Sequence, residues 1–315
     1  ELTEPLDSTQ FGAIKKLKNL GFKTSSHIKL CKNIDEALSH YEELSKIRVE
    51  LGYDIDGIVY KVDSLDLQSR LGYRSTTPRW AIAHKFPAEY SWTQLLAIDI
   101  QVGRTGALSP VARLKPVTVG GVVISNATLH NQDYIAGRDN SGKKIRSGND
   151  IRINDWVEVY RAGDVIPKIS DVDLTKRPTD SKAYQFPSIC PECGAEVVRD
   201  DGDAVIRCID DLNCPAQAIE KLKHFVSRKA FDIEGLGGKQ IEFFFADEAL
   251  SIKEPADIFT LELRDRSNLS KLKDRHGFGK KSAANLFDAI EKKKTIEFSR
   301  LLFSLGIRHV GENVS

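Results

Sequence analysis

The sequence has no methionine, few cysteines and no long apolar run. It begins with Glu1, and this start together with the missing methionine is expected of a segment from within a longer chain or of one whose methionines were replaced. No run approaches the roughly 20 apolar residues that span a bilayer, and the first residues lack a signal-peptide pattern. We therefore expect no membrane partner and a cytoplasmic location. The 46 basic and 45 acidic residues nearly cancel, so net charge gives no argument for a polyanionic partner.

The composition is that of a folded protein with several domains. Hydrophobic residues make up 41% of the chain and charged residues 29%, and 315 residues are more than one core usually organises. Helical and strand patterns mix in residues 1–88, and short apolar runs such as Val117 to Ser125 follow in 89–177. Cysteines gather in 178–217, and helical pattern fills 218–315. We predict a multidomain α+β protein whose second domain is a small β-barrel.

Four of the five cysteines form two pairs, Cys190 with Cys193 and Cys208 with Cys214; Cys31 stands alone. Such clustering is typical of one tetrahedral metal site in a reducing compartment rather than of a disulfide framework. The alternative is four buried reduced cysteines, but this segment is the poorest in apolar neighbours. We predict a closed, structural Zn²⁺ site, because four thiolates leave no position for water.

Three similar glycine motifs interrupt the helical pattern after Ala218. They are Ile233-Glu-Gly-Leu-Gly237, His276-Gly-Phe-Gly279 and Arg308-His-Val-Gly311. Such a turn leaves backbone N–H groups unpaired at a helix start, where they can hold a phosphate of duplex DNA. Basic residues surround the second motif, at Lys271, Lys273, Arg275, Lys280 and Lys281. The alternative is that the glycines are ordinary helix C-caps beside a solvated helix face. The expected DNA-contacting residues here are Gly235, Gly237, Lys239, Gly277, Gly279, Lys280, Lys281 and Gly311.

A further group of polar residues lies before the predicted barrel. The segments Asp54-Ile-Asp-Gly-Ile-Val-Tyr-Lys61 and Ala83-His-Lys85-Phe-Pro87 place one carboxylate, Asp56, and two lysines beside strand pattern. A carboxylate with two cations can hold a metal ion and a phosphate. The alternative, a surface aspartate with two solvated lysines, is favoured when these residues are taken alone.

These motifs, in this order, resemble those of the bacterial NAD-dependent DNA ligases. The segment that ends at Lys61 is similar to the family's fourth nucleotidyltransferase motif, and Ala81-Ile-Ala-His-Lys-Phe-Pro87 to its fifth. Three further segments resemble its OB-fold signatures: Gln101-Val-Gly-Arg-Thr-Gly-Ala-Leu-Ser-Pro110, Ser125-Asn-Ala-Thr-Leu-His-Asn131 and Arg161-Ala-Gly-Asp-Val-Ile-Pro167. The cysteine and glycine motifs resemble its zinc finger and helix-hairpin-helix domain.

The resemblance covers essentially the whole chain and implies four segments. They are the C-terminal part of a nucleotidyltransferase (adenylation) domain at 1–88, an OB-fold barrel at 89–177, a four-cysteine zinc finger at 178–217 and a truncated helix-hairpin-helix domain at 218–315. It also implies a monomer of the bacterial cytoplasm, associated with the nucleoid, that acts in DNA replication and repair.

By the same resemblance the protein seals nicks in double-stranded DNA between a 5'-phosphate and a 3'-hydroxyl. A lysine attacks NAD, AMP passes to the 5'-phosphate, and the 3'-hydroxyl displaces AMP; each step builds charge at phosphorus that protein cations stabilise. Asp56 would support Mg²⁺ or Mn²⁺, and Arg104 would engage the DNA at the nick. The residues carried over to the catalytic and NAD-binding site are Arg48, Asp56, Gly57, Lys61 and Lys85.

The sequence departs from the family in several respects. The nucleophilic lysine of the family's Lys-x-Asp-Gly motif is missing, because neither Asp56-Gly57 nor Asp201-Gly202 has a lysine two residues before its aspartate. The nicotinamide-binding domain, the first part of the adenylation domain and the BRCT domain are likewise expected outside this sequence. In the third glycine motif His309 replaces the first glycine, which weakens the case for a phosphate contact by that motif.

Two other functions compete with this one. A non-catalytic clamp for nicked or branched DNA needs the barrel, the zinc finger and the hairpins, but has no use for Asp56, Lys61 and Lys85 in one pocket. An ATP-dependent ligase is disfavoured, because the resemblance associates the zinc finger and the hairpins with the NAD-dependent enzymes.

Overall fold

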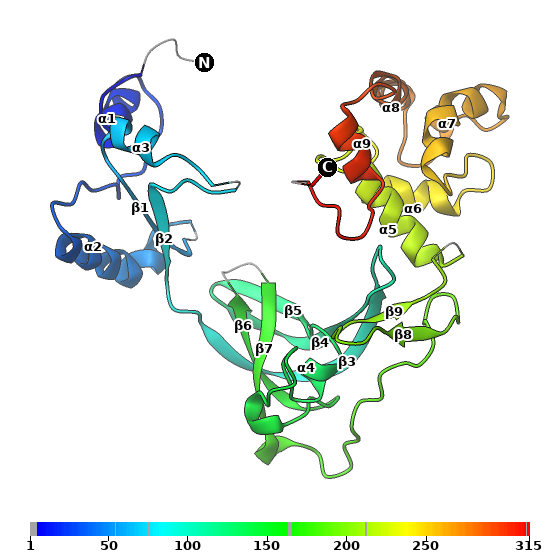
Figure 1. Ribbon diagram of the computed structural model, residues 1–315, viewed down its shortest axis with the longest axis horizontal. Helices are drawn as coiled ribbons and strands as arrows, with labels where there is room; N and C mark the ends of the chain where they lie inside the picture. Colours follow the sequence, from blue (N-terminus) through cyan, green and yellow to red (C-terminus); the bar gives the residue numbers. More distant parts are fainter. Residues whose placement is uncertain (1–4, 54, 75, 163–165, 212, 313) are drawn as a thin grey trace. The chain divides into compact units, whose positions relative to one another are not determined.

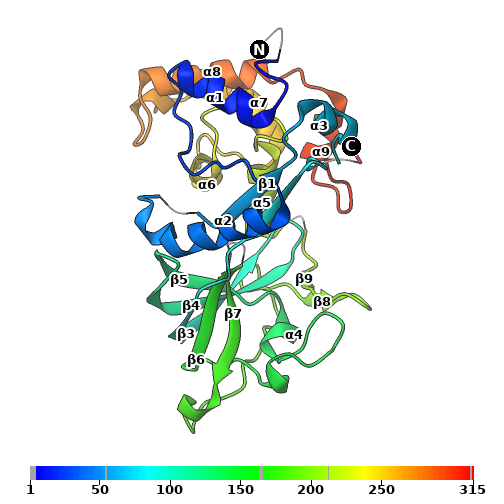
Figure 2. The same ribbon diagram turned by 90° about the vertical axis from the view of Figure 1, so that its left-hand side faces the viewer.

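A computed structural model describes residues 5–53, 55–74, 76–162, 166–211, 213–312 and 314–315 (Figures 1 and 2). The chain divides into two compact units. One comprises residues 1–91, 116–124 and 159–168, and the other comprises 92–115, 125–158 and 169–315. None of the helices in the described ranges is long and apolar enough to cross a membrane.

The first segment combines helices with an antiparallel β-hairpin. Its helices are α1 (Gln10–Asn19), α2 (Ile34–Ile47), η1 (Arg48–Glu50) and α3 (Leu65–Leu71). The side chains of Thr9, Asn33 and Ser64 cap α1, α2 and α3 by accepting hydrogen bonds from backbone N–H groups of their first turns. β1 (Gly57–Lys61) pairs with β2 (Ala81–Lys85), and the register sets Gly57 opposite Lys85 and Lys61 opposite Ala81.

This segment has little core of its own. Among the apolar residues described in 5–89, Leu44 and Phe86 are buried. In contrast, Phe22 is 62% exposed, Ile34 is 65% exposed and Ile82 is 67% exposed.

The second segment is a closed barrel, as the sequence predicts. Its strands are β3 (Tyr90–Val102), β4 (Leu108–Val119), β5 (Val122–Thr128), β6 (Trp156–Ala162) and β7 (Ile166–Asp173), in the order β3-β4-β5-β7-β6. Leu95, Val157 and Ile169 are fully buried, as expected for inward-facing positions of a small barrel. The connections contain α4 (Gln132–Ile135), η2 (Arg146–Gly148) and η3 (Leu174–Lys176).

One predicted apolar run is divided in the structure. Residues Val117 to Ser125 do not form a single strand, because Gly120 and Gly121 turn the chain between β4 and β5. Both glycines have positive φ, +57° and +76°. Two consecutive residues at positive φ form the turn that matches the twist of a two-residue hairpin, and glycine adopts it without steric cost.

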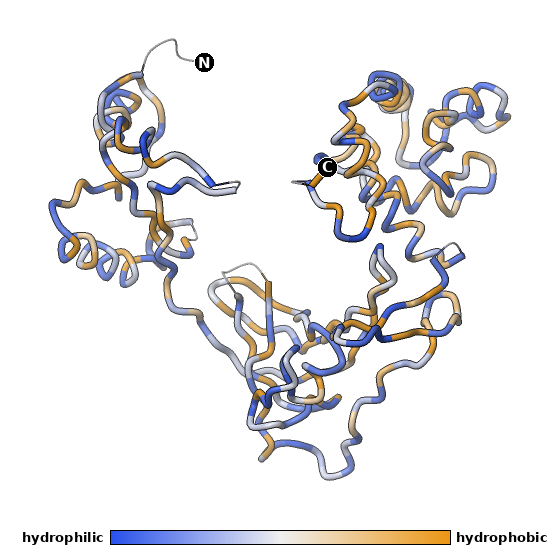
Figure 3. Tube along the Cα trace, viewed as in Figure 1, coloured by the Kyte–Doolittle hydropathy of each residue, from blue (hydrophilic) through white to orange (hydrophobic). Residues whose placement is uncertain are grey.

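The last segment is helical around one apolar core. Its elements are α5 (Pro215–Phe225), α6 (Gly238–Ala246), α7 (Pro255–Ser267), η4 (Leu272–Asp274), α8 (Lys280–Lys292) and α9 (Phe298–Ser304). Apolar residues recur along these helices (Figure 3), and Phe244, Ile258 and Leu272 are fully buried where they meet. The burial of such side chains is the main stabilising contribution.

Candidate functional site

The four clustered cysteines come together around a short β-hairpin. β8 (Val197–Arg199) pairs with β9 (Ile206–Cys208), which ends at the third cysteine. Cys190 precedes a tight turn in which the N–H of Gly194, at φ +75°, donates to the Cys190 carbonyl at 2.9 Å. Cys214 is the N-cap of α5. All four sulfur atoms, including that of Cys193, lie within 4.8 Å of one another.

This geometry fits a four-coordinate zinc ion. A tetrahedron with Zn–S bonds of about 2.3 Å separates its sulfur atoms by about 3.8 Å, and the Sγ atoms of Cys193 and Cys208 are 3.5 Å apart. Burial by itself raises the pKa of the Cys190 thiol. That pKa nevertheless lies below its usual value, because the backbone N–H groups of Glu192 and Cys193 donate hydrogen bonds to the sulfur. The turn thus favours the thiolate, which is the form that binds metal.

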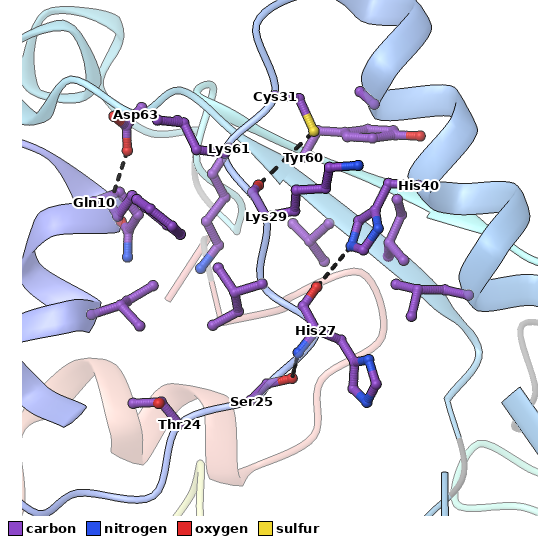
Figure 4. Close-up of a pocket in the computed structure, with 18 of the residues that line it drawn as sticks. Gln10, Thr24, Ser25, His27, Lys29, Cys31, His40, Tyr60, Lys61 and Asp63 are labelled. Atoms are coloured by element: carbon purple, nitrogen blue, oxygen red, sulfur yellow. Dashed lines mark hydrogen bonds between the residues drawn. The ribbon is translucent and has the colours of Figure 1, made fainter. Parts of the chain in front are cut away.

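A cavity of about 970 Å³ lies in the first unit, among α1, α2, β1 and the segment between the two helices. Lys61, the last residue of β1, projects into it, and Lys29 and His40 line the same space (Figure 4). His40 Nε2 lies 2.7 Å from the carbonyl oxygen of His27. Apolar walls combined with cations suit a flat heterocycle that carries a phosphate.

Three of the lining residues, Lys29, His40 and Tyr60, were not predicted as site residues from the sequence. Lys29 and His40 lie in no recognisable motif, so no sequence signal marks them. Tyr60 does lie within a motif, and burial raises the pKa of its phenol. The Tyr60 hydroxyl is 3.0 Å from Nδ1 of His84 on the paired strand. The phenol therefore stays neutral at physiological pH and can act as a hydrogen-bonding group at the wall of the cavity.

Asp56 and Lys85 meet at the other end of the β1–β2 hairpin, where their side chains form an ion pair. Arg48 pairs instead with Glu89, and its guanidinium lies over the Phe86 ring. Lys61 does not join them. It lies four residues along β1 from Gly57, the partner of Lys85, which is about 13 Å at the usual rise of a strand. The structure therefore brings together Asp56 and Lys85 and leaves Lys61 in the cavity.

Gly57 has a structural reason for being glycine. A Cβ atom at this position would lie 2.3 Å from the carbonyl oxygen of His84 and 2.7 Å from Cα of Lys85. Any side chain would therefore push β1 and β2 apart. Asp54, which begins this motif, lies outside the described residues, as do Gly163 to Val165 of the third barrel motif.

The first two glycine motifs adopt the same local geometry. Gly235 and Gly277 have φ of +81° and +82°, and the second glycine of each motif, Gly237 or Gly279, is the N-cap of α6 or α8. Each turn thus leads directly into the amino end of a helix, where N–H groups and the helix dipole favour an anion. In the third motif His309 keeps the positive φ, at +68°, although it is not glycine.

The basic patch predicted around the second motif is smaller in the structure. Arg275 forms an ion pair with Asp247. Lys271 donates to the carbonyl oxygens of Asp265 and Arg266 at 2.9 and 2.6 Å, which caps the carboxyl end of α7. Exposed lysines remain in the first turns of α6 and α8 and beside them, at Lys239, Lys273, Lys280 and Lys281.

Arg104 lies in the β3–β4 turn and is engaged within the protein. Its Nη1 donates to the carbonyl oxygen of Gly306 at 2.5 Å. The side chain predicted to engage DNA therefore has an internal partner just beyond α9.

Comparison with known proteins decides the family. Residues 2–89 match the NAD-dependent DNA ligase adenylation domain, residues 92–181 its OB-fold domain, and residues 190–216 its C4 zinc finger domain. These segments belong to the NAD-dependent DNA ligases. The predicted resemblance, the ligase barrel and the four-cysteine zinc finger are thereby confirmed, whereas the helix-hairpin-helix domain stays a prediction. NAD and Zn²⁺ are the cofactors that these ligase domains imply, and Mg²⁺ stays a prediction.

Proteins named DNA ligase match this chain over nearly all its length. Those of Ruegeria pomeroyi and Roseobacter denitrificans are each 64% identical, over 312 and 314 residues, and that of Paracoccus denitrificans is 62% identical over 313 residues. The matches cover 99%, 100% and 99% of this chain but 42%, 44% and 41% of the relatives. The chain thus spans about two fifths of the length of these curated relatives.

Proposed function

We propose that this chain is the DNA-engaging and nucleotide-contacting part of an enzyme that seals nicks in duplex DNA with NAD. The observation that carries the proposal is the succession of three ligase domains in one chain. A non-catalytic clamp is disfavoured, because a clamp has no use for an adenylation domain. The proposal includes a monomer that binds nicked duplex DNA in the bacterial cytoplasm.

In this proposal Lys61 contacts the nucleotide. Its side chain enters the cavity of the first unit (Figure 4), and a cation there offsets charge that builds on a phosphate during adenylate transfer. Asp56 and Lys85 form a second polar cluster, with a carboxylate for Mg²⁺ or Mn²⁺ beside a cation for a phosphate. Arg48 supports the Lys85 end of the hairpin through its contact with Phe86.

Replacing Lys61 by alanine is expected to slow adenylation in a longer ligase chain that contains these residues and a Lys-x-Asp-Gly segment. Loss of one charge-assisted phosphate contact removes about 2 to 4 kcal/mol of transition-state stabilisation, which is a decrease of roughly 30- to 1,000-fold. Radiolabelled AMP transferred from NAD to the protein measures the rate. Lys18→Ala, at an exposed lysine of α1 outside the cavity, is the control. Equal rates for the two variants would remove Lys61 from the site.

Residues 1–315 by themselves are expected to gain no covalent AMP. Forming a lysyl-adenylate needs a nucleophile held in line with the α-phosphate, and the remaining cations do not replace it. The measurement is intact mass after incubation with Mg²⁺ and NAD, with a longer chain that carries the Lys-x-Asp-Gly lysine as the positive control. A mass gain of one AMP on residues 1–315 would mean that another residue here is the nucleophile.

The exposed lysines at the start of α8 are expected to bind DNA phosphates. The double variant Lys280→Ala with Lys281→Ala should weaken binding to nicked duplex and lower the slope of log affinity against log salt by about one to two. Fluorescence anisotropy over a salt series measures both. The control is Lys292→Ala with Lys294→Ala near the carboxyl end of the same helix, where the helix dipole does not favour an anion. An unchanged slope would make Lys280 and Lys281 part of a merely solvated helix face.

A further inference from the structure

The turn between β3 and β4 is short and internally bonded. The N–H of Gly103 donates to the Ala107 carbonyl at 2.9 Å, and the N–H of Gly106 donates to the Gly103 carbonyl at 2.9 Å. Gly106 has a φ of +75° and is buried. Arg104 and Thr105 are the two residues between these hydrogen-bonded positions, so their backbone can move little unless the turn itself moves.

One side of this turn is attached to the zinc finger. The N–H of Cys208 donates to the Gly106 carbonyl at 2.9 Å, and Arg207 Nη1 donates to the Thr105 hydroxyl at 3.0 Å. A Cβ atom on Gly106 would lie 2.4 Å from the carbonyl oxygen of Cys208. The strand residues that flank the turn, Val102 and Leu108, are buried in one cluster with three of the zinc-binding cysteines. The turn is therefore fixed against the segment that ends in a metal ligand.

The other side of the turn is attached to the end of α9. Arg104 Nη1 donates to the Gly306 carbonyl at 2.5 Å, and Gly306 has a φ of +64°. His224 Nε2 lies 2.8 Å from the Phe303 carbonyl oxygen. Two side chains from elsewhere in the fold thus satisfy carbonyl groups at the carboxyl end of this helix, where the dipole also favours the positive guanidinium.

We infer that the β3–β4 turn links the zinc centre to the end of α9, just before the third glycine motif, with Gly106 and Arg207 as positioning residues that hold Arg104 against Gly306. A zinc ion held by the four cysteines would fix Cys208. The backbone hydrogen bond from Cys208 holds Gly106, and the turn carries Arg104 to the end of α9. The link is a property of the DNA-free protein. Its bearing on ligation rests on the proposed function, because Gly311 of the third glycine motif is among the residues expected to contact DNA.

Hydrogen exchange of the free protein tests the link without DNA. The reporters are the amides of Leu305 and Gly306, which donate to the carbonyls of Leu301 and Phe303 at the end of α9. Gly106→Ala should raise their exchange rates roughly tenfold, as expected when one charge-assisted hydrogen bond is lost. The matched control is Gly142→Ala, at φ +82° with no atom within 4 Å of the added Cβ. It carries the same backbone cost without the collision, and the rates should stay unchanged.

Zinc content separates a broken link from a lost metal site. Gly106→Ala should keep one zinc per chain, and removing zinc from the unaltered protein should raise the same two exchange rates. Thr105→Val, which removes the hydroxyl that accepts from Arg207 Nη1 and leaves the Arg207–Asp203 pair in place, is a milder variant should Gly106→Ala fail to fold. It should raise the rates by a smaller factor.

A double variant identifies Arg104 as the residue through which the turn acts. Arg104→Ala should raise the exchange rates as much as Gly106→Ala does, and the pair should raise them no further than either alone. The link would be overturned if the double variant raised the exchange rates by the product of the two single effects. It would also be overturned if Gly106→Ala and Thr105→Val both left the rates unchanged at full zinc content. Neither outcome would bear on nick sealing, which is measured separately by adenylation and DNA binding.

Discussion

Replacing Cys208 by serine is expected to abolish stoichiometric zinc binding and to unfold the zinc finger. Metal binding at a structural site of this kind supplies about 10 to 16 kcal/mol of apparent free energy at neutral pH, far more than a segment with so few apolar residues can replace. Metal analysis of freshly purified protein and circular dichroism measure the two effects. The control is Cys31→Ser, at a cysteine that lies outside the cluster.

Unfolding of the zinc finger should also destabilise the neighbouring end of the barrel. Cys208 shares a buried cluster with Val102 and Leu108, which flank the β3–β4 turn. DNA affinity should therefore fall as well, while the first segment, with its own hairpin of β1 and β2, should stay folded. A Cys208→Ser protein that keeps one zinc and full DNA affinity would contradict the assignment of this ligand.

Replacing Arg177 by alanine is expected to destabilise the barrel by about 3 to 5 kcal/mol, because the change leaves a buried carboxylate without its cation. The Asp155 side chain is 0% exposed, and Arg177 contacts it at 2.8 Å while also contacting Asp150 at 2.8 Å. Denaturant unfolding measures the change. The neighbouring Lys176→Ala is the control, since Lys176 is 55% exposed in its pair with Asp173 and such pairs contribute at most about 1 kcal/mol. Similar decreases in the free energy of unfolding for the two variants would show that the buried Asp155 pair contributes no more to stability than the exposed Lys176 pair.

The same ion-pair network of Arg177, Asp150 and Asp155 should make the stability of the barrel depend on pH. Burial alone raises the pKa of Asp150, but hydrogen bonds from Arg152 and Arg177 hold it below its usual value of 3.8. A carboxylate whose pKa is lower in the folded than in the unfolded state stabilises the fold above the unfolded pKa, and this contribution is lost as pH falls through the folded pKa. Stability should thus decline below about pH 4, with a shallower decline in Arg177→Ala. An equal decline in both proteins would exclude Arg177 as the cause.

Short motifs in the sequence were enough to predict the metal site, the β-barrel and the family. A Cys-x-x-Cys pair with two further cysteines specifies a metal site almost by composition, because four thiolates in a segment with little apolar content have few other uses. The glycine motifs specify turns for a similar local reason. Gly235 and Gly277 are at positive φ, which glycine adopts without steric cost. The helix-hairpin-helix domain that they predict still awaits a test.

Only the tertiary structure decided which side chains meet. Asp56 pairs with Lys85 because β1 and β2 set Gly57 opposite Lys85, and the same register holds Lys61 away from both. Arg275 has Asp274 as its acidic neighbour in the sequence but pairs with Asp247, 28 residues earlier. Arg104 reaches Gly306, 202 residues away. Local chemistry is encoded by neighbours in the chain, whereas these contacts depend on strand register and packing between distant segments, which no single motif contains.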